Sequence, residues 1–170
     1  MPTVFLLSPA RCSGRRADML ATSSRSALGE QLRGRGAPVG DVFAWLSALY
    51  FRGKLAYGTA FGRALVMAPG AGLLAPETLI TAAELRAMGE VDVESDAFVR
   101  PLRRHAKRLP ARDPIVLLGS IATGKYTTAL LDVLGKRLAF PAAFVGRGDM
   151  SRGGLMLRAA KTGIELEYTA

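Results

Sequence analysis

The segment most suggestive of chemistry is glycine-rich and runs from Gly119 to Tyr126, with the sequence Gly-Ser-Ile-Ala-Thr-Gly-Lys-Tyr. It contains the spacing G-x-x-x-x-G-K, whose backbone N–H groups bind phosphate when a strand precedes the loop and a helix follows it. A triphosphatase loop has Ser or Thr at the position of Tyr126, where the hydroxyl binds magnesium. The pattern therefore predicts an anion site without a triphosphatase, and an ordinary strand–turn–helix junction is the alternative. Its candidate ligand-binding residues are Gly119, Ser120, Gly124, Lys125 and Tyr126.

A second segment, Gly146 to Gly154, combines four glycines with two arginines, one aspartate and one serine. Glycines let a backbone approach a ligand closely, and guanidinium groups bind anions. Asp149 is a candidate general acid or base, or a carboxylate that orients one of the arginines. Arg147, Ser151 and Arg152 are the candidate ligand-binding residues here, and a flexible surface loop is the alternative.

A third segment follows the first apolar run of the chain. Ser8 ends that run, and Arg11, Arg15 and Arg16 lie near the start of a predicted helix, where phosphate binding is favoured. We expect these four residues to bind phosphate. Glu77 is the carboxylate expected nearest to the second strand end, as a second catalytic candidate or as the start of the next helix.

Other catalytic chemistries find little support. Cys12 is the only cysteine, so an intrachain disulfide is excluded, and a catalytic thiol would need a base or a lowered pKa. The only histidine, His105, falls in register with apolar residues of a predicted helix, so we expect it to pack. One cysteine and one histidine cannot form a structural zinc site. We expect neither a metal nor a cofactor.

The elements that position these residues follow from the hydrophobic pattern. Three runs are apolar throughout, and each is followed by a turn and a helical pattern, which indicates parallel strands covered on both faces. They are Val4 to Leu7, Ala64 to Ala68 and Ile115 to Leu118. A fourth strand is predicted near Arg137 to Phe140 and an edge strand near Ile164 to Tyr168. We therefore predict an α/β fold, a single three-layer domain over residues 1–170 with a mainly parallel sheet of four to five strands.

Helices are predicted between and after these strands. An amphipathic helix begins at Asp41 and extends to about Phe51, beyond which Gly53 and Gly58 weaken it. Further helices are expected at Arg15 to Ala21, Ser26 to Leu32, Thr81 to Met88, Ser95 to Leu109, Tyr126 to Leu134 and Leu155 to Ala160. In open α/β sheets ligands bind beyond the carboxyl ends of the strands. That rule selects the loops after Leu7, Ala68 and Leu118, with the 146–154 loop reaching the same edge.

Composition sets the class of partner. The 170 residues carry a formal net charge of +9, which favours nucleic acid, nucleotides or other phosphates. A run of basic residues on the predicted 95–109 helix adds to this, although a solvated helix face is the default. No signal peptide or membrane span is apparent, so we expect a cytoplasmic protein without a membrane partner. The oligomeric state is left open.

Three segments carry a resemblance. Ser8-Pro9-Ala10, Gly119 to Tyr126 and Val145 to Gly154 resemble those of a family of small uncharacterised bacterial proteins, over nearly the whole chain. The strand–loop order is also similar to the uracil-DNA glycosylase-like fold. That resemblance implies a nucleobase pocket framed by the loop after the first strand and by a late loop. The His-Pro-Ser type motif usual in the late glycosylase loop is absent from this sequence.

These observations favour a nucleotide- or nucleic-acid-directed enzyme that acts at an N-glycosidic bond. The arginines and Lys125 would bind phosphate, Tyr126 would stack on a base, and Asp149 or Glu77 would supply acid–base chemistry. A non-catalytic nucleic-acid-binding module is one alternative. A small-nucleotide enzyme or sensor that uses Gly119 to Lys125 is the other.

Overall fold

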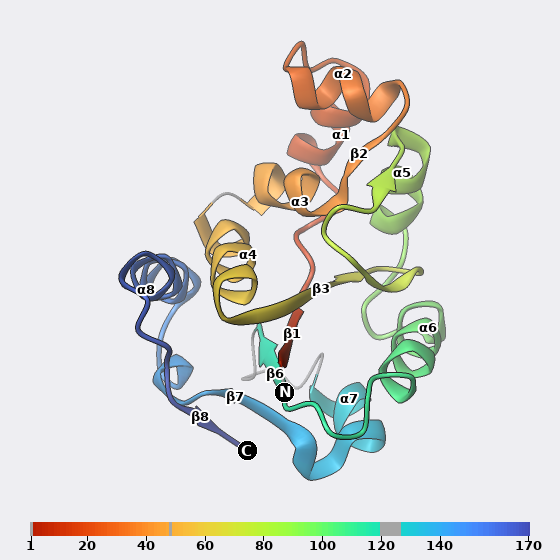
Figure 1. The fold of residues 1–170 in the computed structure, drawn as a ribbon. Coiled ribbons are helices and arrows are strands. Elements are labelled where there is room, and N and C mark those ends of the chain that lie inside the picture. The colour runs from red at the N-terminus through yellow and green to blue at the C-terminus, as the bar shows by residue number, and fades with distance from the viewer. Residues whose placement is uncertain (1, 48, 120–126) are drawn as a thin grey trace.

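The structure is a computed structural model, and it describes residues 2–47, 49–119 and 127–170, with only the backbone of Asp149. Its main sheet has six strands in the order β4-β3-β1-β6-β7-β8 (Figure 1). The bounds are β1 (Thr3–Leu7), β3 (Gly62–Ala68), β4 (Gly72–Leu74), β6 (Ile115–Leu118), β7 (Leu138–Pro141) and β8 (Tyr168–Thr169).

The prediction of an α/β fold with a mainly parallel sheet is confirmed, but the sheet is larger than expected. Strands β3, β1, β6 and β7 are parallel, and the antiparallel strands β4 and β8 flank them. The four to five strands expected become six because β4 forms within the loop after Ala68. Its three residues are too few to show a periodic pattern in the sequence. The edge strand expected over Ile164 to Tyr168 is also shorter, since β8 begins only at Tyr168.

The order of the parallel strands places a topological switch point at the centre of the sheet. The chain leaves β1 for β3 on one side and later enters β6 on the other side, so connections diverge between β1 and β6. Leu7 lies opposite Val66 of β3 and opposite Leu118 of β6. The three strands therefore end at one edge, here called the carboxyl edge, and ligands of such sheets bind at the switch point.

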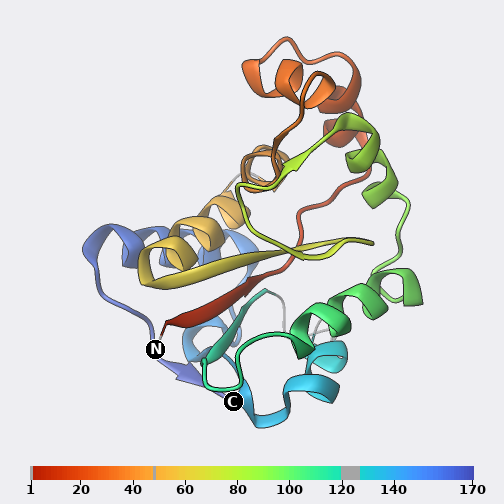
Figure 2. The same ribbon diagram turned by 45° about the vertical axis from the view of Figure 1, so that its right-hand side comes forward.

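Helices pack on both faces of the sheet (Figures 1 and 2). Phe5 and Leu7 of β1 are buried in one cluster together with Phe51 and Met156, which come from α4 and α8. The alternate residues of β1 are buried in a second cluster with α6 and α7. The helices are α1 (Arg15–Thr22), α2 (Ala27–Arg33), α3 (Val39–Ser47), α4 (Leu49–Phe61), α5 (Ala82–Gly89), α6 (Asp96–Lys107), α7 (Thr127–Leu134) and α8 (Asp149–Thr162).

A smaller group of elements extends beyond the carboxyl edge. It contains α1, α2 and α5, together with a two-stranded antiparallel sheet of β2 (Ala37–Pro38) and β5 (Leu79–Ile80) (Figure 1). Thr81 caps α5 by accepting from the Glu84 N–H, while the Glu84 carboxylate accepts from the Thr81 N–H. In the described part of the chain, no helix has the length and apolarity that crossing a membrane requires.

Helix α4 is longer than the sequence indicates. It continues to Phe61 through Gly53 and Gly58, which were expected to weaken it. A Cβ at Gly53 would lie 2.6 Å from the carbonyl oxygen of Gly153 in α8, and a Cβ at Gly58 would lie 3.3 Å from the Cβ of Phe5. The glycines therefore allow α4 to pack closely on α8 and on β1, and this packing outweighs their low helix propensity.

The 146–154 loop is only partly a loop. Helix α8 begins at Asp149, six residues before the expected start at Leu155. Gly153 lies inside this helix, where its Cβ position is 2.9 Å from the Leu49 carbonyl oxygen. Close contact with α4 thus explains a glycine that the sequence analysis assigned to a ligand-binding loop.

Candidate functional site

A buried lysine and a buried serine meet at the carboxyl edge. Ser8 directly follows β1, and its N–H donates to the Leu118 carbonyl at 3.1 Å. Lys54 of α4 donates from Nζ to the Ser8 hydroxyl at 2.7 Å and to the Ser8 carbonyl at 3.0 Å. Ser8 is 3% exposed and Lys54 is 2% exposed. A buried ammonium is stable only with such polar contacts, so the geometry places a fixed cation beside a hydroxyl at the switch point.

Aromatic rings complete the surroundings of Lys54. Its Nζ lies 4.0 Å from the centre of the Tyr50 ring and 5.5 Å from that of Phe51, and both rings precede it on α4. Cation–π attraction replaces part of the hydration that burial removes. The sequence analysis missed Lys54. One feature of the sequence points to it: this lysine lies three residues from Phe51 and three from Tyr57, which places it on the apolar face of a helix.

Gly119 closes the site from the β6 side. A Cβ at this position would lie 2.5 Å from the Ser8 Oγ and 2.7 Å from the Ser8 Cβ. Only glycine therefore fits beside Ser8, which is a packing reason for the first glycine of the G-x-x-x-x-G-K pattern. The next candidates of that pattern, Ser120, Gly124, Lys125 and Tyr126, lie outside the described residues.

The first turn of α8 reaches the same edge. Helix α4 runs away from the carboxyl edge, because its last residue leads into Gly62, which pairs with Thr3 at the start of β1. Gly153 contacts the first residues of α4, so α8 begins near that edge. Asp149 is the first residue of α8, four residues before Gly153. The structure thus brings the backbone of Asp149 to the edge that holds Lys54, while its side chain is outside the described part.

The arginines and the serine of α8 and its approach differ in their surroundings. Arg152 is buried and donates to the Phe144 carbonyl from Nε at 3.3 Å and from Nη2 at 3.1 Å, which ties α8 to the preceding 3₁₀ turn. Arg147 is exposed and donates to the Ser151 hydroxyl at 2.9 Å. Arg152 therefore has a structural contact, and the Arg147–Ser151 pair is the one that faces solvent.

The early arginines lie beside the group of elements beyond the edge. Arg16 donates to the Trp45 carbonyl, and its guanidinium lies 4.3 Å from the centre of the Trp45 ring. Arg15 is exposed. Arg11 is exposed and lines a pocket of about 300 Å³ beyond β1 and β3, together with Cys12 and Pro69. Of the three, Arg11 is placed best to contact a ligand.

Cys12 does not have the surroundings of a nucleophile. Its side chain is buried, its Sγ is 3.4 Å from the Ala10 carbonyl, and burial raises the pKa of the thiol to about 12. His105 is bonded elsewhere, since its Nδ1 accepts from the Leu73 N–H of β4 at 2.9 Å. The structure therefore provides no cysteine–histidine pair among the described contacts.

Glu77 makes no hydrogen bond with Ser8 among the described residues. It is exposed in the turn between β4 and β5, next to Pro76, whose carbonyl accepts from the Gly40 N–H at the start of α3. Among the described residues, no hydrogen bond or ion pair holds its carboxylate.

No cluster of three metal-binding side chains occurs within the described residues. A comparison with protein-family models, curated proteins and solved structures finds no match for this chain. Its function must therefore be argued from the carboxyl edge itself.

Proposed function

We propose that this protein is a nucleotide- or nucleic-acid-directed enzyme that acts at an N-glycosidic bond, on a single three-layer domain. The observation that carries the proposal is the buried Lys54, 2.7 Å from the Ser8 hydroxyl at the switch point of the sheet. This is where open α/β sheets bind ligands, and a fixed positive charge there suits a phosphate or a developing anion. The net charge of +9 supports an anionic partner.

In the proposed reaction, water replaces the base at the anomeric carbon. The carbon–nitrogen bond breaks, its electron pair leaves with the base, and the oxygen of water bonds to the carbon. Asp149 stabilises the positive charge on the sugar and takes the proton from water, which finally reaches the base. Ser8 and Lys54 are positioning residues, because their buried hydrogen bonds hold the ends of β1 and β6 beneath the site. Arg11, Arg147 and the arginines nearby bind phosphate.

Two further supports come from the fold. The strand–loop order that resembles the uracil-DNA glycosylase-like fold is the reason for choosing an N-glycosidic bond. The backbone of Asp149 is in the first turn of α8, near the carboxyl edge, and this supports the choice of its carboxylate over Glu77 as the acid–base group. Glu77 stays a candidate only for contacts with a long substrate.

The test is release of base from a panel of nucleosides and of single- and double-stranded oligonucleotides, including uracil-containing DNA. We expect Asp149→Asn to lower single-turnover base release by about 10²-fold or more, with oligonucleotide binding retained. Asp113→Asn is the matched control, because Asp113 precedes β6 and therefore lies at the opposite end of the parallel strands. Undiminished release by Asp149→Asn would remove the proposed mechanism, and so would release by no member of the panel.

A non-catalytic nucleic-acid-binding module is the second candidate, and one observation favours it. Helix α6 and the loop after it expose a row of basic side chains. These are Arg100, Arg104, Lys107, Arg108 and Arg112. Binding of this kind depends steeply on salt and involves no turnover. Polymer binding without base release, unchanged in Asp149→Asn and Ser8→Ala, would favour this module. Thermal stabilisation by mononucleotides with weak polymer binding would instead favour the small-nucleotide enzyme or sensor.

A further inference from the structure

A pocket on the other face of the sheet from α4 is lined by basic side chains. It lies between β3, β4 and the end of α6, and its volume is about 240 Å³. Arg63, His105 and Arg108 contribute the charged and polar groups, and Leu65 and Leu73 contribute apolar surface. These two leucines belong to the core cluster of α6 and α7, whereas Lys54 comes from α4 on the opposite face. The pocket is therefore separate from the Ser8–Lys54 pair.

The imidazole in this pocket is held in one orientation. His105 Nδ1 accepts from the Leu73 N–H at 2.9 Å, so the neutral ring carries its proton on Nε2. A Cβ on Gly72 would lie 2.4 Å from Nδ1, and Gly72 has a φ of +78° that also favours glycine. The missing side chain at Gly72 thus lets the ring approach β4. As a result Nε2–H is a fixed hydrogen-bond donor at the pocket.

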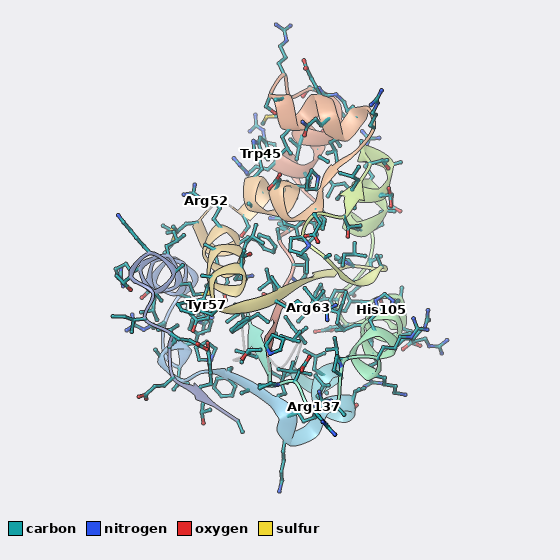
Figure 3. All side chains as sticks on the ribbon, in the orientation of Figure 1. Trp45, Arg52, Tyr57, Arg63, His105 and Arg137 are labelled. Atoms are coloured by element: carbon teal, nitrogen blue, oxygen red, sulfur yellow. The ribbon has the colours of Figure 1, made fainter. Side chains whose placement is uncertain are left out.

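The two arginines of the pocket differ from their neighbours on α6. Arg103 pairs with Asp132, and Arg100 pairs with Asp96. Arg63 and Arg108 are exposed, and within the described residues neither side chain makes a hydrogen bond or an ion pair. The lining of the pocket includes neither Asp nor Glu. Figure 3 labels Arg63 on β3 and His105 on α6. Positive charge from two elements is therefore concentrated there without a carboxylate to neutralise it.

We propose that this pocket binds the phosphate group of a phosphomonoester. Guanidinium groups match the geometry of phosphate oxygens, and the Nε2–H group of His105 is a third hydrogen-bond donor besides the two arginines. The volume is below the roughly 300–1,000 Å³ of sites for drug-sized ligands, which suits one phosphate and part of its carbon substituent. Leu65, Leu73 and Leu109 form the apolar wall for that substituent. Two kinds of ligand carry such a phosphomonoester: a free mononucleotide and the terminal phosphate of a nucleic acid.

Calorimetric titration with inorganic phosphate and with a nucleoside monophosphate tests the site. We expect the monophosphate to bind more tightly than phosphate, and Arg63→Gln and Arg108→Gln each to weaken it about tenfold. Arg112→Gln is the matched control, since Arg112 is exposed on the same basic surface but does not line the pocket. A change of less than twofold is expected there. Thermal unfolding of each variant verifies that it is folded.

Oligonucleotides with and without a 5′-phosphate distinguish the two sources. Tighter binding of the phosphorylated strand, lost in Arg63→Gln, identifies the chain end as a ligand. Mononucleotide binding without such a difference identifies the free nucleotide. No binding of any phosphate, or equal weakening by Arg112→Gln and Arg63→Gln, would overturn the proposal. Since Ser8 is not in the pocket, Ser8→Ala should leave phosphate binding unchanged, so this site and the proposed base release can fail separately.

Discussion

At the scale of single residues, the contact of Ser8 with Lys54 and Gly119 is the feature on which the site depends. The Ser8 hydroxyl accepts from Lys54 at 2.7 Å and donates to the Leu118 carbonyl at 3.3 Å, entirely within the core. Buried polar groups of this kind stabilise a fold only while each has its partner. Changes to Ser8 or Lys54 should therefore affect both the stability of the protein and the candidate site.

Removal of the Ser8 hydroxyl should be costly. We expect Ser8→Ala to lower the free energy of unfolding by about 1–3 kcal/mol, because Lys54 loses a buried acceptor. Ser13→Ala is the control, as Ser13 is exposed five residues further on, and it should stay within about 0.5 kcal/mol. Urea denaturation measures both. Equal stability of the two variants would contradict the buried contact.

The close approach of Gly119 gives a compensation test. Gly119→Ala places a Cβ 2.5 Å from the Ser8 Oγ, and we expect a loss of about 1–3 kcal/mol from overpacking. Adding Ser8→Gly removes both atoms that clash, so the double variant should be more stable than the sum of the two single changes predicts. Strict additivity in thermal or urea unfolding would show that the two residues are not in contact.

The Cys12 thiol should not react in the folded protein, and its burial should make the protein less stable at alkaline pH. Burial raises its pKa from 9.0 to about 12 in the folded protein, so the contribution is present below pH 9 and is lost as the pH rises toward 12. The free energy of unfolding of the wild type should therefore fall relative to that of Cys12→Ala above pH 9. Labelling by iodoacetamide at pH 8 should require unfolding, and rapid labelling of the folded protein would refute the burial.

At the scale of elements, the contact between α4 and α8 decides how far both helices extend. Gly53 and Gly153 lie where the two backbones meet, with the Cβ of Gly53 only 2.6 Å from the Gly153 carbonyl oxygen. Gly154 follows in the same helix, yet the nearest atom to a Cβ at this position is the end of the Arg158 side chain, at 3.5 Å. Gly53 and Gly154 both lie inside helices, so alanine has the same intrinsic advantage at each. They differ in the room that is available for a Cβ atom.

Alanine substitution should separate these two effects. We expect Gly53→Ala to destabilise the protein by about 1–3 kcal/mol through steric overlap. Gly154→Ala should instead stabilise it by up to about 1 kcal/mol, because alanine favours a helix where space is available. Chemical denaturation of both variants compares them directly. The same sign for both would mean that α8 does not pack on α4 through Gly153.

Strands and most helices were predictable from local pattern, whereas the extent of α4 and α8 was not. Val4 to Leu7 and Ile115 to Leu118 are apolar throughout, and such runs indicate buried parallel strands. Local pattern predicts that Gly53 weakens α4 and assigns Gly153 to a ligand-binding loop, because the contact between the two glycines joins residues about one hundred positions apart. Lys54 was missed for the same reason, since its acceptor on Ser8 comes from a distant part of the chain.

At the scale of the whole molecule, charge and topology favour the same partner. The net charge of +9 predicts that any nucleic-acid binding weakens as salt rises. The switch point between β1 and β6 predicts where a small part of that ligand enters the fold. Charge alone would distribute contacts over the basic surface of α6, so the location of binding separates a specific site from a general attraction.

The most direct test is to map binding on the protein by NMR during titration with a single-stranded oligonucleotide at moderate salt. The account predicts that the largest amide shifts occur at Ser8, Gly119 and the first turn of α8, and that Ser8→Ala reduces them. Shifts confined to α6 and the loop after it, or no shifts at all, would contradict a functional site at the carboxyl edge.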